Sequence, residues 1–339
     1  MTTTLDKSLV KALVEAWGPS GYEDQVCALI RGYVADLADD IRVDNGGSLI
    51  AHMASSQPNA RKIMIASHMD EIGLMVHHID SDGYARFSPM GGLFPITLYG
   101  NRVRLADGTT GTIGLDNWVN AAKTPPLTDF FVDFSGAAQP VEIGAVATLW
   151  RDYAERGDRI IAKSLDDRIG CVVAIEAMRQ IRALGQPLTH DLYFVFTTQE
   201  EVGIRGARTA AYGISPHFGI AVDVAPSGDS PKSEKVAITV GGGAAIKVRD
   251  VGHIVPPAVK QLMIRRAAAA NIPYQMEVLD LGTTDAAAIQ MAGAGVPTGA
   301  ISIPVRYVHT TSETVDSHDV EACVDLLVAV VTQPLEGID

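Results

Sequence analysis

Histidine and carboxylate side chains follow several apolar runs of this sequence, at or near the point where each run ends. In an open α/β sheet, ligands bind beyond the carboxyl ends of the strands, so these side chains are expected at one sheet edge. Imidazoles and carboxylates without thiolates suit zinc, cobalt and manganese. The residues, each with the run that precedes it, are His68 and Asp70 (IMIAS), Glu200 and Glu201 (YFVFTTQ), Asp223 (GIAV) and His309 (AISIPVRYV).

Glu200 and Glu201 form the only Glu-Glu pair in the chain, and a strongly apolar strand leads to them. Two adjacent carboxylates in a half-buried place repel each other and lose hydration, so something must compensate. Two divalent cations would do so. One Glu would then bind metal, and the other would stay free to take a proton from the attacking water. Because neighbouring strand residues point to opposite faces, the chain must leave strand geometry here, with the turn completed at Val202-Gly203.

The triplet His68-Met69-Asp70 has a plainer interpretation, because a His-x-acid triplet is expected roughly once by chance in a chain of this composition. A second triplet, at 78–80, runs into the turn signal Ser-Asp-Gly and indicates a surface hairpin. The first triplet ends an apolar strand, where residues i and i+2 share a face. His68 can therefore bind metal while Asp70 orients it.

Asp166 and Asp167 begin a predicted helix, where one acid is explained as an N-cap in a favourable helix dipole. The alternative is that Asp166 is a ligand shared between two metals, and the residues alone do not decide between the two. Asp223 could merely cap a turn, and His309 could be a surface residue of a polar loop. Only the whole set favours a metal centre.

Composition excludes some classes of partner. The net charge of −13, from 27 basic and 40 acidic residues, argues against nucleic acid and anionic membranes. Cys27, Cys171 and Cys323 lack zinc-ribbon spacing and indicate reduced thiols. The N-terminus lacks the apolar segment of a signal peptide, and no apolar run could span a bilayer. These features predict a soluble, cytoplasmic protein.

Hydrophobic patterning divides the chain into an α/β part, residues 1–73 and 163–339, and an inserted β-rich part, residues 74–162. The insert has short β pieces between turn signals, typical of a small barrel or sandwich, and a loop at 120–129 that we expect to be mobile. Apolar strands alternating with helices elsewhere predict a mostly parallel sheet covered on both faces. The expected helices are 5–17, 24–38, 166–184, 256–270, 284–292 and 317–332; the expected strands include a hairpin over 41–53, then 61–70 continued by the run IGLMV, 191–198, 218–224, 275–280 and 298–304.

Five stretches in order resemble the dinuclear-metal aminopeptidases that assemble into tetrahedral particles, a family also known as glutamyl aminopeptidase-like or endoglucanase-like. The similarity extends to SGYE at 20–23 and to residues 282–299, and so covers nearly the whole chain. It implies an α/β peptidase domain with an inserted β-barrel dimerisation domain, dimers that build dodecamers, and two zinc or cobalt ions. The five stretches are SHMDEIGLMV, AKSLDDRIGC, TTQEEVGIRGA, AVDVAPSGD and IPVRYVHTTSE.

The resemblance also implies a role for each candidate residue. His68 would bind one metal and His309 the other, with Asp166 bridging both; Glu201 and Asp223 would each complete one shell; Glu200 would be the general base and Asp70 would support His68. The stretch at 120–129 is shorter than the loop with a His-Leu element that members often carry there.

The function predicted from these features is metal-assisted removal of an N-terminal residue from short peptides. A metal-dependent deacylase of related fold is the nearest alternative. Glycoside hydrolysis by paired carboxylates would have no use for the two histidines, and three Trp are few for a carbohydrate platform. A non-catalytic metal-binding protein would have no need of a free Glu200. Lys123, Arg249 and Arg306 could favour acidic substrates if they line the cleft, although exposed basic residues are the commoner case.

Overall fold

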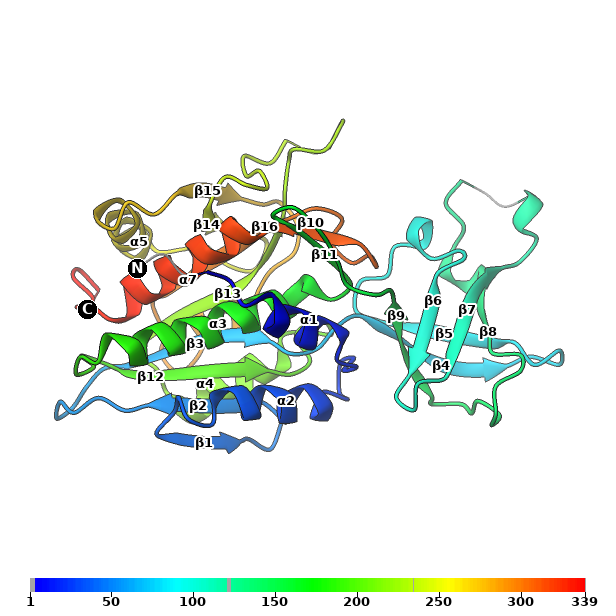
Figure 1. Cartoon of the computed structure of the whole chain (residues 1–339), viewed down its shortest axis with the longest axis horizontal. Coiled ribbons are helices and arrows are strands. Elements are labelled where there is room, and N and C mark those ends of the chain that lie inside the picture. Colours follow the sequence, from blue (N-terminus) through cyan, green and yellow to red (C-terminus); the bar gives the residue numbers. More distant parts are fainter. Residues whose placement is uncertain (1–3, 121–122, 234, 339) are drawn as a thin grey trace.

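Nearly continuous apolar runs form one eight-stranded sheet at the centre of the α/β part of the molecule (Figure 1). The computed structural model describes residues 4–120, 123–233 and 235–338. Four neighbouring strands in the middle of the sheet run parallel, and antiparallel pairings extend it on both sides, which confirms the predicted mostly parallel sheet. In spatial order the strands are β1 (Asp40–Val43), β2 (Leu49–Met53), β12 (Asp191–Thr197), β3 (Lys62–His68), β13 (Phe218–Pro226), β16 (Thr298–Val305), β14 (Ala244–Arg249) and β15 (Tyr274–Val278).

Both faces of the sheet are covered, because the central strands carry apolar residues on each side. In β3, Ile63 and Ile65 pack into the large core under five helices, whereas Met64 and Ala66 pack into a smaller core under two. The five helices are α1 (Lys7–Glu15), α2 (Asp24–Val34), α3 (Leu165–Leu184), α5 (Pro257–Ala269) and α7 (Ser317–Val331); the two are α4 (Arg205–Ile214) and α6 (Ala286–Gln290).

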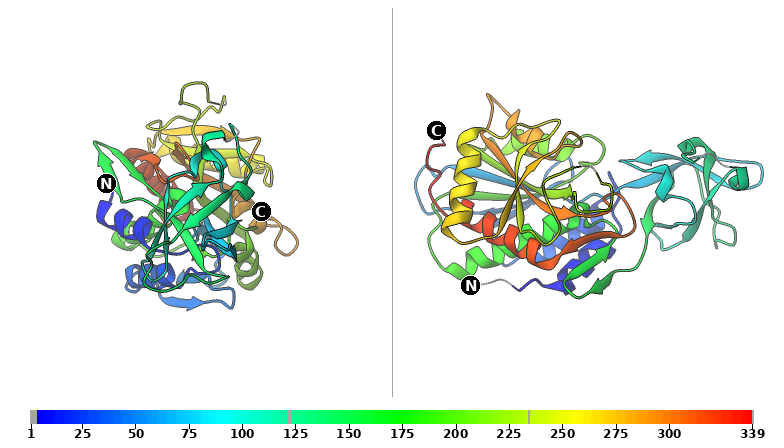
Figure 2. Two further views of the ribbon diagram at one scale, coloured as in Figure 1. Left: turned by 90° about the vertical axis from the view of Figure 1, so that its right-hand side faces the viewer. Right: turned by 90° about the horizontal axis from the view of Figure 1, so that it is seen from above.

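A closed six-stranded barrel lies at one end of the elongated molecule, beyond the carboxyl end of β3 (Figures 1 and 2). It has its own apolar core, which includes Leu74, Val76, Phe87, Val103 and Val132. This confirms the inserted barrel. Around the barrel the strands are β4 (Gly73–Ile79), β5 (Ala85–Met90), β8 (Phe130–Asp133), β7 (Thr110–Leu115), β6 (Arg102–Leu105) and β9 (Val146–Trp150), and its short 3-10 turns are η1 (Pro95–Thr97), η2 (Trp118–Asn120) and η3 (Leu127–Asp129).

A small third sheet connects the barrel to the α/β part. It contains β10 (Ala154–Arg156) and β11 (Arg159–Ala162), and β11 pairs with β17 (Glu313–Asp316) from near the C-terminus. The barrel itself therefore ends with β9, although the sequence up to residue 162 has the same pattern of short β-like runs as the rest of the insert. That pattern could not reveal the pairing of β11 with β17, because β17 lies far away in sequence.

Several elements differ from the sequence prediction. The run IGLMV does not continue β3 but begins the first barrel strand, β4. Helix α4 and strand β14 were not predicted, because α4 presents mainly alanines to the core and β14 begins with two alanines directly after three glycines. Residues 121 and 122 of the loop expected at 120–129 lie outside the described residues. Among the described helices, none has the length and apolar character needed to cross a bilayer.

Candidate metal centre

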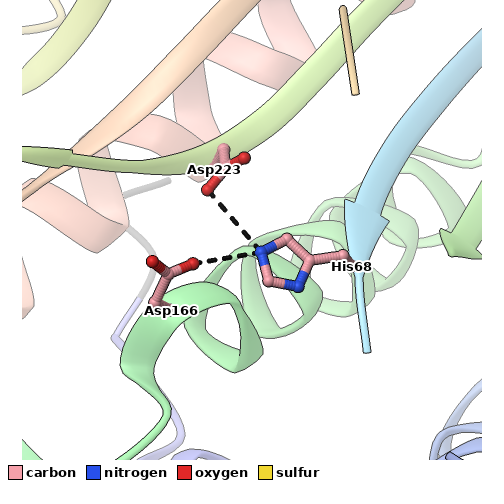
Figure 3. Close-up of side chains that lie close together, drawn as sticks. All are labelled: His68, Asp166 and Asp223. Atoms are coloured by element: carbon pink, nitrogen blue, oxygen red, sulfur yellow. Dashed lines mark hydrogen bonds and ion pairs between the residues drawn. The ribbon is translucent and has the colours of Figure 1, made fainter. Parts of the chain in front are cut away.

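His68, Asp166 and Asp223 come together at the carboxyl edge of the large sheet, from β3, the start of α3 and β13 (Figure 3). His68 Nε2 lies 3.0 Å from Asp166 Oδ1 and 4.0 Å from Asp223 Oδ1. All three residues are buried. Their convergence follows from topology, because β3 and β13 are parallel neighbours and α3 packs against both.

A second group shares Asp166 with the first. His309 Nε2 lies 3.3 Å from Asp166 Oδ2 and 3.2 Å from Glu201 Oε1. Each oxygen of the Asp166 carboxylate thus has a different imidazole as its neighbour. In each group of three, one potential ligand atom per residue lies within 4.8 Å of the others. The two groups together offer two imidazoles and three carboxylates.

The electrostatics of this cluster fit divalent cations. Burial raises the pKa of Asp223 well above its usual range, with His68 opposing and Asp166 adding to the rise. Burial and the charge of Asp166 also raise the pKa of Glu201, and its hydrogen bond with His309 opposes this rise. Burial lowers the pKa of His309, but its hydrogen bonds to Asp166 and Glu201 outweigh this and raise it to about 12. Two cations would compensate this excess of buried negative charge.

The sequence left open whether the acids at the start of α3 cap the helix or bind metal, and in the structure Asp166 and Asp167 differ in this respect. Both residues have non-helical backbone angles, and the peptide bond between them is cis. Asp167 accepts hydrogen bonds from the backbone N–H groups of Gly170, at 3.1 Å, and His68, at 3.1 Å. Asp167 therefore satisfies the start of the helix, and the carboxylate of Asp166 is left for the cluster.

The backbone leaves strand geometry immediately before the Glu pair. Gln199 has a left-handed φ of 56°, two residues after β12 ends, and the Gly203 N–H donates to the Glu200 carbonyl at 2.9 Å. Gly203 has a φ of 124°, which favours glycine. The expected turn at Val202-Gly203 is present, but the chain departs from the strand earlier than the sequence suggested.

Asp70 is connected to both halves of the site. Its Oδ1 lies 3.4 Å from His68 Nδ1, and the same imidazole nitrogen lies 3.0 Å from the Asp70 carbonyl oxygen. The carboxylate also accepts backbone hydrogen bonds from Glu200, at 2.9 Å, and Glu201, at 3.1 Å. Ser20, in the SGYE stretch, donates to it at 2.6 Å. Asp70 thus fixes His68 relative to the loop that carries the two Glu residues.

Two further residues hold the cluster, and the residue-by-residue sequence analysis did not select them. Glu313 accepts hydrogen bonds from the backbone N–H groups of His309, at 2.7 Å, and Asp166, at 3.0 Å. Burial, with the charge of Asp166, raises the pKa of Glu313 to about 8. The Gly92 carbonyl, at the end of the barrel, lies 2.8 Å from His309 Nδ1. A Cβ atom on Gly92 would lie 2.6 Å from that nitrogen, so only glycine fits.

Glu200 belongs to neither group of three and faces the same cavity as the cluster. This cavity has a volume of about 670 Å³, and all five cluster residues and Glu200 line it. Burial raises the pKa of Glu200 well above its usual range, opposed by His68 and reinforced by Asp223. A carboxyl group in this place can hold and return a proton beside the cluster.

The fold and the site together define a class of α/β protein with an inserted barrel and an acidic, histidine-containing centre. Residues 47–326 match the model of the M42 glutamyl aminopeptidase family, and the chain belongs to this family. It is an aminopeptidase of that family and hence a hydrolase.

Similar proteins cover nearly the whole chain. The lysyl aminopeptidase of Pyrococcus furiosus is 34% identical, over 97% of this chain and 97% of its own. The structure of the aminopeptidase APDkam598 from Desulfurococcus kamchatkensis is 38% identical, with a TM-score of 0.91, over 98% of this chain and 97% of that chain. The structure of the TET1 peptidase of Pyrococcus horikoshii is 29% identical, with a TM-score of 0.85, over 97% of this chain and 99% of that chain.

Proposed function

We propose that this protein removes N-terminal residues from short peptides with two divalent cations, zinc or cobalt being favoured over manganese. His68 and Asp223 would hold one cation, His309 and Glu201 the other, and Asp166 would contact both. The observation that carries the proposal is the carboxylate of Asp166, whose two oxygens lie 3.0 and 3.3 Å from different imidazoles. A carboxylate shared in this way is suited to bridging two cations.

Bound cations would act as Lewis acids on the scissile carbonyl and lower the pKa of the attacking water. Glu200 lies outside both groups, so its carboxylate stays free to take the proton from that water. Glu200 then passes the proton to the leaving amine. Asp70 keeps Glu200 in reach, because it accepts the backbone hydrogen bonds of both Glu200 and Glu201.

Glu200→Gln tests the assignment of the base. The amide cannot accept the proton but keeps the size of the side chain, so metal content should stay close to that of the parent. Turnover of an aminoacyl-p-nitroanilide, after chelation and reloading with zinc or cobalt, should fall about a hundredfold to ten-thousandfold.

Glu176→Gln is the matched control, since Glu176 is also a largely buried Glu but lies in α3 and pairs with Arg179. It should keep parental turnover. His68→Ala and Asp223→Ala should lose metal as well as activity. A Glu200→Gln enzyme with most of its activity would show that Glu200 is not the base.

We also propose that residues 74–162 act as a dimerisation unit and that dimers build larger particles. The barrel region exposes several large apolar side chains, here called the barrel patch, and exposed apolar patches mark sites of protein–protein interaction. The TET1 peptidase of P. horikoshii assembles into a tetrahedron or a large octahedral shell, which supports self-association here. The barrel patch consists of Phe94, Ile96, Tyr99, Trp118 and Val119, all at least half exposed.

A further inference from the structure

We propose that the cavity beside the cluster selects a neutral, apolar N-terminal side chain, such as that of leucine or methionine, over an acidic or a basic one. This inference rests on the proposed function and specifies its substrate class. Family membership leaves the preference open, because the family description is glutamyl whereas the P. furiosus relative is a lysyl aminopeptidase. The preference must therefore come from the side chains of this chain.

Apolar side chains form the part of the cavity wall that does not belong to the cluster. The hydroxyl groups that also line it, such as those of Ser227 and Thr283, carry no charge. Moving an apolar side chain from water into such a wall is favourable, whereas a charged side chain would lose hydration without gaining a partner. The apolar wall includes Val224, Pro226, Val236, Leu279, Leu281 and Val308.

Lys247 is the one ionisable side chain among the described lining residues outside the cluster and Glu200. Its ammonium group is hydrogen-bonded to Glu277, and it lies 3.4 Å from Asp250 Oδ2. All three side chains are buried. The two carboxylates compensate the charge of Lys247, so it offers little attraction to an acidic substrate side chain.

The same arrangement gives no counter-charge for a basic substrate side chain. Glu277 and Asp250 do not line the cavity, whereas Lys247, with which both pair, does. A substrate ammonium or guanidinium would meet the Lys247 end of this cluster rather than its carboxylates. The cavity is therefore unfavourable to both signs of charge.

The basic residues that could have favoured acidic substrates lie outside the cavity lining. Arg306 forms a two-point ion pair with Asp229, with Nε at 2.9 Å from Oδ1. Arg249 pairs with Asp280 at 3.0 Å. Neither arginine, nor Lys123, lines the cavity. Apart from Lys247, an acidic preference thus has no cationic group to support it among the described lining residues.

The first test compares kcat/KM of the metal-loaded enzyme for the p-nitroanilides of leucine, methionine, glutamate and lysine. The leucine and methionine substrates should exceed the other two by at least about tenfold, the scale on which an apolar pocket discriminates. A glutamate or lysine substrate hydrolysed as fast as the leucine substrate would overturn the inference.

Substitutions at Leu281 test the cavity directly, because this wall residue is 48% exposed and tolerates change better than a core residue. Leu281→Arg should raise the glutamate-to-leucine ratio of kcat/KM about tenfold, and Leu281→Glu should raise the lysine-to-leucine ratio by a similar factor. Leu184→Arg is the matched control, since Leu184 is 51% exposed at the end of α3 and does not line the cavity. Equal effects of Leu281→Arg and Leu184→Arg would contradict the inference.

A binding measurement separates this inference from the proposed function. Calorimetry with the cobalt-loaded Glu200→Gln protein and the dipeptides Leu-Ala, Glu-Ala and Lys-Ala reports side-chain preference without turnover. Suppose that the Glu200→Gln protein binds Leu-Ala most tightly but the parent enzyme hydrolyses none of the substrates. That result would overturn the peptidase reaction and leave the selectivity standing. Turnover by the parent enzyme, combined with tighter binding of Glu-Ala or Lys-Ala, would uphold the peptidase reaction and overturn the selectivity.

Discussion

Two pairs of adjacent acids make this site, and in each pair the two carboxylates have different surroundings. Asp166 faces both imidazoles, whereas Asp167 accepts two backbone hydrogen bonds. Glu201 lies against His309, whereas Glu200 stays outside both groups. A left-handed residue precedes each pair, Ser164 with a φ of 48° and Gln199 with a φ of 56°. Two adjacent side chains can both stay at one site with different partners here because the backbone abandons regular geometry, and such residues concentrate at functional sites.

Metal binding should displace protons from the cluster. In the metal-free protein, hydrogen bonds to Asp166 and Glu201 raise the pKa of His309 to about 12 in spite of burial. The stability that this raised pKa contributes is fully present below the unfolded pKa of about 6.5 and is lost as pH rises through about 12. His309 is therefore protonated near neutral pH, and a cation must replace its proton.

Calorimetric titration with cobalt, in buffers of different ionisation enthalpy, measures this exchange. At least about one proton should be released per protein, and cobalt affinity should fall as the pH is lowered from about 8 to about 6. His309→Gln should release fewer protons and bind less cobalt. His217→Gln, on a histidine outside the cluster, should behave like the parent. A binding heat that is the same in every buffer would show that no proton is exchanged.

At the scale of elements, the barrel supplies part of the support for His309, a proposed metal ligand. The segment after β5 brings the Gly92 carbonyl to 2.8 Å from His309 Nδ1, while Glu313, at the start of β17, holds the His309 backbone. His309 itself has a left-handed φ of 60°. Contacts from two sheets thus fix the orientation of one imidazole.

Gly92→Ala should displace that imidazole, because the added Cβ atom would lie 2.6 Å from His309 Nδ1. Metal affinity of the site that contains His309 should fall about tenfold to a hundredfold, the usual effect of losing a group that orients a ligand. The measurement is cobalt binding followed by absorbance.

Gly32→Ala is the control for this substitution, since Gly32 lies in helix α2 and a Cβ atom there meets nothing within 4 Å. It should leave cobalt binding unchanged. Unaltered affinity in Gly92→Ala would show that the contact from the barrel does not hold His309 in place.

The sequence could predict the side chains that gather at the sheet edge, because an apolar run followed by His or Asp is visible locally and the ends of parallel strands converge. It could not predict Glu313, which acts on the backbone of Asp166 at a separation of 147 residues. It could not predict Gly92 either, because the contact depends on how the barrel is placed against β17. Helix α4 was missed because small alanines give a weak apolar pattern.

At the scale of the whole molecule, the barrel patch is the strongest indication of self-association. Tyr99 and Trp118 stack with ring centroids 6.3 Å apart while remaining 54% and 63% exposed. Paired aromatic residues of this kind provide a large apolar contact at the centre of an interface.

The double variant Tyr99→Ser/Trp118→Ser should shift the protein from its parental assembly toward the monomer, with at least about a tenfold rise in the dissociation constant. Light scattering coupled to gel filtration, over a range of concentrations, measures the change. Leu184→Ser removes a comparably exposed apolar side chain from α3 and should leave the mass unchanged. An unaltered assembly in the double variant would place the interface elsewhere.

Because the Gly92 carbonyl contacts His309, the position of the barrel and the orientation of one imidazole of the candidate metal centre depend on each other. The chain passes between the two bodies twice, once between β3 and β4 and once between β9 and β11, and both crossings are short. A rotation of the barrel about these crossings would draw the Gly92 carbonyl away from the imidazole and loosen one cation before the other. A contact that clamps the barrel, such as one from a neighbouring copy of the chain, would therefore slow the loss of a cation held by His309.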